Sequence, residues 1–518
     1  RRCRLVLPSR DFAWAQALEQ HAHVVRDEFL RAPMCRVASF KPSQPQPDGR
    51  WFAVVPVLFL DFLVMALPGG ILPIMLNDHY GPRSYIIVGY AQSLKGMLAF
   101  IGAPIIGALS DVVGRKHLFL TCVLGTASPY AALGLGCSLD THLTLFGLSG
   151  MLAATFPLAF AYICDVVPEG PARTSAMGST IGFGLGMAFL LGPPLGSLLD
   201  HAYGARAVFG ACLWVTLANA AVALWGIVER PPQQPRLPLS ALLRRASPLR
   251  CVKMVRANAA MRLLVLIVAW YYFALWGLVA NKGLYARRRF GLGSRETAAQ
   301  LSTFGLASTL SQGAGLRLAR RWLSDAQIAR RCFGFAVLSQ LIYGGQLRSP
   351  APTQPGARTA ARPHTCAHAF TLGARAGVAS ASWMLYPAMA LLGMSVGGFA
   401  SLSAICSQVV SPRVLGEAQG VLASVKALME GVGPLAFAAA MTAAEGSALP
   451  GSPWLVGATC MCTSLMLCLR LERAVQSANG RDDPEQAQEE QGSYASGEET
   501  EPLAFGTQLV REAEREGG

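Results

Sequence analysis

The stretch that decides the fold is SYIIVGYAQSLKGMLAFIGAPIIGALSDVVGRK, residues 84–116. Its first part, 84–109, is predominantly apolar. A helix needs about 20 such residues to cross the roughly 30 Å hydrocarbon core of a bilayer. The stretch then ends in Asp111 and the pair Arg115-Lys116, which is an abrupt change to charged composition. It therefore predicts a membrane-spanning helix followed by a short basic loop.

Similar apolar runs recur along the whole chain. They predict spans on both sides of a polar gap, at 51–76, 84–109, 117–138, 142–164, 174–199, 207–228, 261–280, 297–316, 329–347, 382–409, 417–442 and 452–470. Only 14% of the 518 residues are charged, against about 25% in a typical soluble protein. The sequence thus predicts an all-α, polytopic membrane protein of about twelve transmembrane helices in two six-helix halves.

The polar segments set the predicted domain boundaries. These are a disordered or non-native extension at 1–50, a first helical bundle at 51–228, a basic proline-rich linker at 229–260, a second bundle at 261–470 with a loop or insertion at 348–381, and a disordered acidic tail at 471–518. No apolar signal-peptide region occurs in the first 50 residues.

The distribution of basic residues predicts the orientation. Cytoplasmic loops carry an excess of Lys and Arg, so the linker and both termini are predicted to be cytoplasmic, in the plasma membrane or an endomembrane. Several basic residues fall on the predicted outer side, against this rule: Lys282, Arg287, Arg288, Arg289 and Arg295.

The composition also argues against other classes of protein. The net charge is +14, but the arginines lie in short clusters between apolar runs, which is typical of membrane loops rather than of nucleic-acid binding. There is no phosphate-binding glycine loop with a lysine and no nucleophile–base arrangement. We therefore expect no enzymatic activity, no nucleic-acid partner and no cofactor. His364, Cys366 and His368 lie in a low-complexity stretch, and we expect no metal site.

An internal repeat supports the division into halves. Residues 165–196 contain DVVPEGPARTSAMG and LLGPPLG, and residues 408–435 contain QVV, a single arginine and EGVGPL at an offset near 242. Two related bundles along one chain are the architecture of a large class of transporters.

The motif from Gly107 to Lys116 resembles the signature loop of the major facilitator superfamily, which lies between its second and third helices. Gly114 suits a tight turn. The resemblance implies a gating motif of Gly107, Asp111, Gly114, Arg115 and Lys116. In the family, this loop pairs with a carboxylate at the cytoplasmic end of helix four, where this chain has Asp165, and the pairing favours the outward-facing state. The alternative is simple anchoring by positive charge on the cytoplasmic side.

A second motif lies on the predicted fifth span, where small residues favour close helix packing. It comprises Gly178, Gly182, Gly186, Gly192, Pro193 and Gly196. The pattern is similar to the Gly-Pro motif of the drug:proton antiporter branch, and a generic packing helix is the alternative.

Longer runs such as FLDFLVMALPGG and EAQGVLASVKALMEGVGP resemble the hippocampus-abundant-transcript proteins, which are similar to tetracycline resistance antiporters. Span 142–164 lacks the arginine that many proton-coupled members carry there.

Few ionisable residues lie within the predicted spans, and four of them are the functional candidates: Asp61, Lys95, Lys426 and Glu430. A charge at the centre of a membrane helix costs about 2.5–3.5 kcal/mol on insertion scales, so each is a candidate for transport or coupling. Structural ion pairs are the alternative, with Asp61 pairing with Lys95 and Lys426 pairing with Glu430 four residues on. Asp61 is the preferred proton or substrate contact, because a carboxylate removed from water can exchange a proton near neutral pH. Family packing would bring helices two and eleven together.

Aromatic residues cluster on the predicted seventh span: Trp270, Tyr271, Tyr272, Phe273 and Trp276. They would suit an organic-substrate pocket, but an interface belt or lipid-facing packing is the favoured interpretation.

These observations predict a secondary active transporter of a small organic solute that works by alternating access. The resemblance implies proton-coupled antiport. The alternatives are a proton symporter, a facilitative carrier of a sugar-like solute, or a non-transporting scaffold or sensor. The expected partners are the lipid bilayer, the solute and protons, and the chain is expected to be a monomer.

Overall fold

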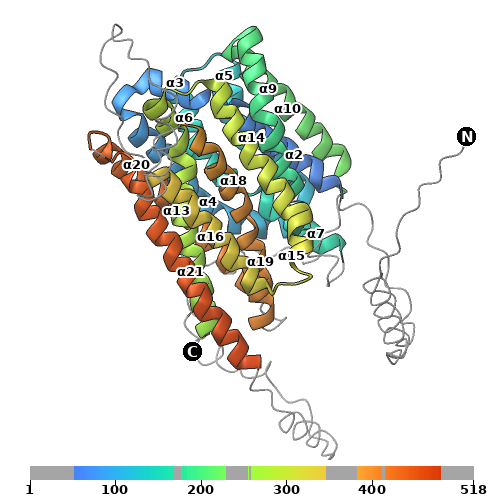
Figure 1. Ribbon diagram of the computed structural model, residues 1–518. Helices are drawn as coiled ribbons and strands as arrows, with labels where there is room; N and C mark the ends of the chain where they lie inside the picture. The colour runs from blue at the N-terminus through green and yellow to red at the C-terminus, as the bar shows by residue number, and fades with distance from the viewer. Residues whose placement is uncertain are drawn as a thin grey trace, which may run out of the picture. The chain divides into compact units, whose positions relative to one another are not determined.

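The computed structural model describes residues 52–167, 177–178, 180, 182–228, 255, 258–345, 382–410, 415–447 and 449–479. Within these ranges every regular element is a helix and there is no strand. Figure 1 shows the helices running alongside one another as a bundle. The predicted extension at 1–50, most of the linker, the insertion at 348–381 and the tail beyond Asn479 lie outside the described residues.

Glycine and proline separate the helices of the first half. These helices are α2 (Val54–Ala66), α3 (Leu72–Tyr80), α4 (Ser84–Val113), α5 (Arg115–Gly134), α6 (Leu139–Leu148), α7 (Thr155–Val166), α9 (Met187–Tyr203) and α10 (Ala205–Gly226). Pro68 lies in the short turn Leu67–Gly70 between α2 and α3, where the helix is interrupted because proline cannot donate a helical hydrogen bond. Gly114 has a φ of 108° between α4 and α5, which confirms the predicted tight turn.

Polar side chains cap the start of two helices of the second half. Its helices are α13 (Ala259–Phe290), α14 (Ser294–Leu310), α15 (Leu316–Ala319), α16 (Asp325–Gly344), α18 (Leu385–Ser395), α19 (Gly397–Val409), α20 (Leu415–Ala444) and α21 (Ser452–Asn479). The Asn258 side chain accepts a 2.9 Å hydrogen bond from the backbone N–H of Ala260. Ser324 caps α16 in the same way, through the backbone N–H of Gln327.

Eight helical stretches of the described chain are long and apolar enough to cross a membrane: 72–107, 139–166, 182–203, 205–226, 259–290, 382–407, 418–444 and 452–473. The remaining predicted spans coincide with helices α2, α5, α14 and α16, which do not meet the same requirement of length and hydropathy. The all-helical prediction is confirmed, and the count of twelve spans stays a prediction.

Two helices run well past their predicted ends. α13 was expected to end at 280 but continues to Phe290, because Leu284, Tyr285 and Ala286 are buried in the same core. α21 was expected to end at 470 but continues to Asn479. Its additional turns bury Leu471 and pair Glu472 with Arg330 of α16 at 3.2 Å. Packing against neighbouring helices extends both elements into sequence that reads as polar.

The two halves pack against each other mainly through two helix pairs, α4 with α20 and α9 with α14. At the first contact a Cβ added to Gly96 would collide with the backbone of Gly431. At the second, a Cβ added to Gly305 would lie 2.6 Å from the carbonyl carbon of Phe189. Glycine therefore lets the backbones approach closely at both contacts. The predicted adjacency of helices two and eleven is confirmed, because they correspond to α4 and α20.

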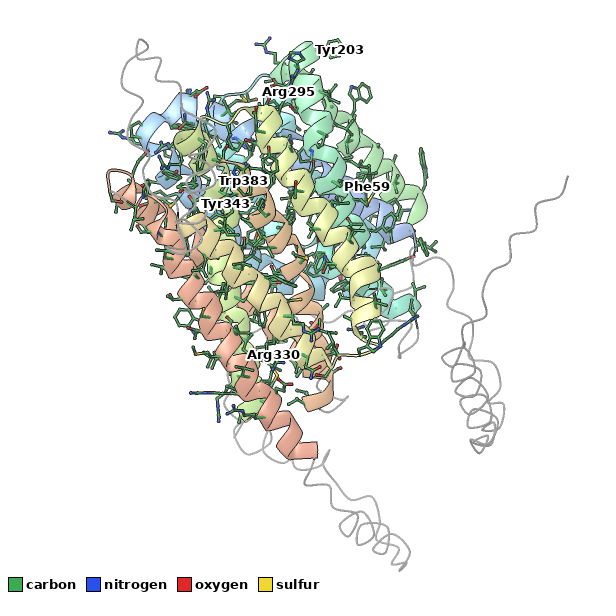
Figure 2. The ribbon with its side chains drawn as sticks, in the orientation of Figure 1. Phe59, Tyr203, Arg295, Arg330, Tyr343 and Trp383 are labelled. Carbon is green, nitrogen blue, oxygen red and sulfur yellow. The ribbon has the colours of Figure 1, made fainter. Side chains whose placement is uncertain are left out.

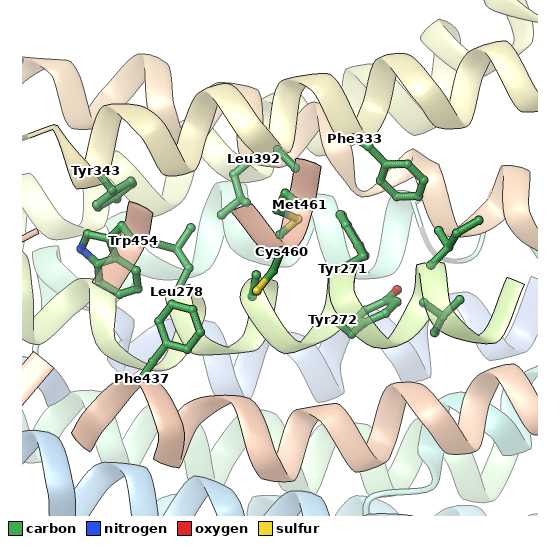
Figure 3. Packing of buried hydrophobic residues seen from close by; sticks show 14 of the residues in the cluster. Tyr271, Tyr272, Leu278, Phe333, Tyr343, Leu392, Phe437, Trp454, Cys460 and Met461 are labelled. Carbon is green, nitrogen blue, oxygen red and sulfur yellow. The ribbon is translucent and has the colours of Figure 1, made fainter. Parts of the chain in front are cut away.

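The largest core cluster lies mainly in the second half. Figure 3 shows side chains from α13, α16, α18 and α21 meeting there, including Tyr271, Phe333, Leu392 and Met461. Trp454 of α21 is fully buried and stacks on Phe437 of α20 with ring centroids 5.7 Å apart. These contacts join α20, which touches the first half, to the rest of the second half.

Large apolar side chains also cover much of the outside. Trp214 and Trp225 of α10 are 73% and 86% exposed, and Met466 of α21 is 65% exposed. A soluble monomer rarely exposes extended apolar surface, so this exterior is suited to lipid. Figure 2 shows charged residues at the ends of the helices, with Arg295 at one end of the bundle and Arg330 toward the other.

Candidate functional site

Asp61 lies in the middle of α2 and is 8% exposed. The Thr126 hydroxyl of α5 donates a hydrogen bond of 2.9 Å to its Oδ1. The same hydroxyl also lies 2.9 Å from the Cys122 carbonyl oxygen of its own helix. A buried carboxylate is costly unless it is hydrogen-bonded, and Thr126 supplies that partner from the neighbouring helix.

Lys95 lies on α4 beside the contact between the halves and is 6% exposed. Its Nζ atom lies 4.4 Å from the centroid of the Phe146 ring on α6, a cation–π geometry. It interacts electrostatically with Glu430 and more weakly with Asp61. Its neighbour Gly96 makes the close backbone approach to α20.

Glu430 and Lys426 lie one turn apart on α20. Glu430 interacts electrostatically with both lysines, Lys95 and Lys426. Among the described residues, however, no ion pair of 4.0 Å or less joins any of the four charged side chains. The predicted pairs Asp61–Lys95 and Lys426–Glu430 are therefore through-space interactions and not direct contacts. The row of charges runs along the junction of α4 and α20.

Lys426 is surrounded by aromatic rings from both halves of the chain. Its Nζ atom lies 5.0 Å from the ring centroid of Phe156 on α7, 5.4 Å from that of Tyr272 on α13 and 5.5 Å from that of Phe399 on α19. Tyr272 and Phe399 also pack edge to face at 5.6 Å. We call Phe156, Tyr272 and Phe399 the aromatic cage.

The expectation of an interface belt on the seventh span is wrong for two of its residues. Tyr271 and Tyr272 are 1% and 6% exposed, and Figure 3 shows both within the packed cluster. Tyr271 donates a hydrogen bond of 3.1 Å to the Ser395 carbonyl oxygen. Trp270, at 41% exposure, fits the original interpretation. Only one face of α13 is directed toward the core. Because adjacent residues point to different faces of a helix, a run of aromatic residues in the sequence does not show which of them are buried.

The gating motif lies where α4 turns into α5. The Nε atom of Arg115 donates to Oδ2 of Asp165, at the end of α7, over 2.9 Å. Arg115 also donates to the Ser110 hydroxyl, which in turn donates to the Gly107 carbonyl oxygen over 2.6 Å. The geometry expected from the resemblance is present between Arg115 and Asp165, whereas the Asp111 side chain lies outside the described residues. Lys116 is partly buried in the first turn of α5.

The glycines of the second motif divide between two neighbours. An added Cβ would meet Gln312 at Gly182 and Thr309 at Gly186, both in the second half. At Gly192 and Gly196 it would meet Ala66 and Leu67 of the first half. Pro193 lies within α9, and Gly178 has no heavy atom within 4 Å of an added Cβ. The motif thus packs the turn 182–186, just before α9, against the second half and α9 itself against the first.

Arg288 had no explanation at the sequence level, and the structure gives it one. Its guanidinium donates to Asn77 Oδ1 at 2.9 Å, to Ser84 Oγ at 2.8 Å and to the Gly81 carbonyl oxygen, all in the first half. It also pairs with Glu445, just after α20, at 2.5 Å. One side chain of α13 therefore connects the halves at the end of α4 opposite to Arg115.

The sequence does not indicate the other functional candidates, because their residue types are common in membrane helices. Thr126, Phe156 and Phe399 gain their roles only from neighbours far away in the chain. For Arg288, the signal was its conflict with the charge rule for loops. The cluster His364, Cys366 and His368 lies outside the described residues, within which no group of three metal-ligating side chains occurs.

The chain matches a family profile described as Major Facilitator Superfamily over residues 54–348, which is more than half of its length. The human hippocampus abundant transcript-like protein 1 is 26% identical over 435 residues, covering 80% of this chain and 78% of the relative. The class C tetracycline resistance protein of Escherichia coli is 26% identical over 410 residues, covering 77% of this chain and 91% of the relative.

Solved structures agree on the fold. The human organic anion transporter MFSD10 superposes with a TM-score of 0.58 at 20% identity, over 82% of this chain and 100% of the other. The nucleoside transporter NupG gives a TM-score of 0.59 at 11% identity, over 82% and 99% of the two chains. The charged junction, the two helix pairs and these matches together lead to one conclusion: the chain is a multi-pass membrane protein that belongs to the Major Facilitator Superfamily.

Proposed function

We propose that the chain is a secondary active transporter that moves a small organic solute by alternating access, with proton antiport as its source of energy. The observation that carries the proposal is the row of Lys95, Glu430 and Lys426 at the junction of α4 and α20, together with Asp61 on α2, which interacts electrostatically with Lys95. Ionisable groups inside a membrane bundle are costly and typically mark substrate or ion pathways, and among the described residues no direct ion pair offsets that cost here.

The contacts at the two ends of α4 support the same proposal. Arg115 and Asp165 pair at one end, within the first half. Arg288 joins the two halves at the other end. Alternating access requires a barrier on each side of a central site, and each barrier must open in turn. Polar contacts of this kind break and re-form more readily than a packed apolar core.

Proton symport is a second candidate, and one observation favours it. Two lysines flank a single glutamate on the α4–α20 junction. A solute with negative charge is attracted to that row, and a proton on a nearby carboxylate strengthens the attraction. Solute and proton would then bind together and move in the same direction.

The test is solute flux into proteoliposomes under imposed pH gradients. Antiport predicts that an acidic interior drives accumulation, and symport predicts that an acidic exterior does so. We expect Asp61→Asn to abolish gradient-driven accumulation in either case, because the amide cannot exchange a proton. Asp140→Asn is the control, since that carboxylate accepts a hydrogen bond from Tyr80 at an end of the bundle.

Undiminished, pH-dependent accumulation by Asp61→Asn would remove Asp61 from the mechanism. A gradient-independent flux would instead identify a facilitative carrier. No flux of any solute from a broad panel of metabolites and drugs would favour a non-transporting scaffold.

A further inference from the structure

We infer that the aromatic cage, together with Lys426 and Lys95, is the binding site for an organic anion with a flat apolar body, of the class of aromatic carboxylates. This inference rests on the proposed transport function and names the chemistry of its solute. It depends on which polar groups at the junction of the halves have partners and which do not.

The first observation is a surplus of hydrogen-bond donors. The amino groups of Lys95 and Lys426 and the hydroxyl of Tyr272 form no hydrogen bond with any described residue. Lys95 and Tyr272 are each 94% buried, given their exposures of 6%. None of the three atoms is fully enclosed by protein, in contrast to the unpartnered Trp276 Nε1 and Asn281 Oδ1. Buried donors normally have acceptors, so this surplus is suited to the oxygen atoms of a ligand.

The second observation is the sign of the local charge. Among the described residues, Glu430 is the one carboxylate that interacts with both lysines, and Tyr272 also interacts with it. Asp61, the next carboxylate, interacts with Lys95 more weakly than Glu430 does and is hydrogen-bonded to Thr126. The row of Lys95, Glu430 and Lys426 therefore carries one more positive than negative charge when all three are ionised. An anion would neutralise this excess positive charge, whereas a cation would be repelled by the two lysines.

The third observation is the aromatic lining. Phe156, Tyr272 and Phe399 all lie within 5.5 Å of Lys426 Nζ, measured to their ring centroids. Ring faces stabilise the ammonium group but leave its N–H donors without acceptors. A planar solute can pack against these rings while its carboxylate accepts from the lysine. Because Phe156 comes from the first half and the other two rings from the second, such a solute would touch both halves.

The test compares matched probes on the purified full-length chain in detergent. The probes are 2-naphthylacetate, the corresponding naphthylethylammonium and naphthylethanol, and plain acetate. Binding is measured by calorimetry and by the shift in thermal unfolding. We expect naphthylacetate to bind about tenfold or more tightly than the alcohol, and acetate to bind weakly because it lacks the ring.

The variants test the residues directly. Lys426→Gln should weaken naphthylacetate about tenfold and leave the alcohol unaffected, and Lys426→Arg should retain most of the binding. Lys282→Gln is the control, because it removes a lysine from α13 outside the cage. Phe399→Leu gives a second test that keeps all charges, and it should weaken naphthylacetate and the alcohol but not acetate.

Tighter binding of the ammonium probe would overturn the inference, and so would unchanged naphthylacetate binding in Lys426→Gln. Flux in proteoliposomes separates this inference from the proposed function. Transport of only neutral or cationic solutes would leave the transporter in place and end the case for an anion. Binding of naphthylacetate without flux of any solute would support the anion site and contradict the proposed transport function.

Discussion

Thr126 supports the buried Asp61 carboxylate by a direct 2.9 Å hydrogen bond. Hydrogen bonds to charged groups contribute about 1.5–3 kcal/mol. We therefore expect Thr126→Val to lower the thermal stability of the purified protein by an amount in that range. The measurement is thermal unfolding of Thr126→Val, Asp61→Asn and the double variant, because coupled residues give non-additive effects.

Thr121→Val is the matched control for this cycle. Thr121 is on the same helix, and its hydroxyl also donates to the carbonyl oxygen four residues earlier, at 2.9 Å, but it is exposed and far from Asp61 in its contacts. An equal loss of stability in both threonine variants, or strict additivity with Asp61→Asn, would contradict the assignment of Thr126 as the partner of Asp61.

At this scale the sequence reveals charges better than it reveals their partners. Asp61, Lys95, Lys426 and Glu430 stand out because each interrupts an apolar run. Their surroundings do not, because a threonine or a phenylalanine in a membrane helix is ordinary until the fold brings it beside a charge. The direct ion pairs of the alternative interpretation are absent among the described residues for a related reason. Spacing along a helix gives the face a residue occupies, and not the rotamer it adopts among the aromatic rings.

Among the helices, the crossing of α4 and α20 depends on glycine. A Cβ at position 96 would collide with the backbone at Gly431. We expect Gly96→Ala to destabilise the protein by about 1–3 kcal/mol, the usual cost of overpacking, and to reduce transport because the row of charges lies beside this crossing. Thermal unfolding and proteoliposome flux measure the two effects.

The control for the crossing is Gly210→Ala in the interior of α10, where an added Cβ has no heavy atom within 4 Å. Both substitutions improve helix propensity by up to about 1 kcal/mol, so their difference isolates the collision. If Gly96→Ala were as stable and as active as Gly210→Ala, the close approach of the two backbones would not matter.

Helices were the most predictable part of the molecule. Apolar run length located the elements, and the glycine motif of α9 indicated close packing before its neighbours were known. The ends of α13 and α21 were not predictable, because Tyr285 and Leu471 continue each helix through contacts with other helices. Hydropathy does not predict a polar terminal turn of a helix when contacts with other helices stabilise that turn.

Across the whole molecule, Arg288 holds one end of the two halves together. It contacts Asn77, Gly81 and Ser84 in one half and Glu445 in the other. We expect Arg288→Gln to favour opening at that end, and each loss of 1.4 kcal/mol would raise the ratio of open to closed molecules about tenfold. Spin labels at the exposed positions Leu135 and Trp383, one in each half, should report a longer and broader distance distribution.

Arg295→Gln provides the control for this experiment, because it removes an exposed positive charge beside the start of α14. An unchanged distance distribution in Arg288→Gln, or an equal change in Arg295→Gln, would show that the Arg288 contacts do not hold this end closed. The charge rule for loops assumes solvated side chains, and Arg288 does not meet that condition. This arginine is 13% exposed and serves as a joint between helices.

The close backbone contact at Gly96 divides α4 into two arms of unequal length. At a rise of 1.5 Å per residue, Gly96 lies about 18 Å from the Ser84 end of α4 and about 26 Å from the Val113 end. A rigid tilt of α4 about this contact would displace the tip near Arg115 farther than the tip near Arg288, by a ratio of about 1.4. The shorter arm ends near Arg288, whose contacts join the two halves. A small opening at that end would therefore accompany a larger displacement at the opposite end of α4.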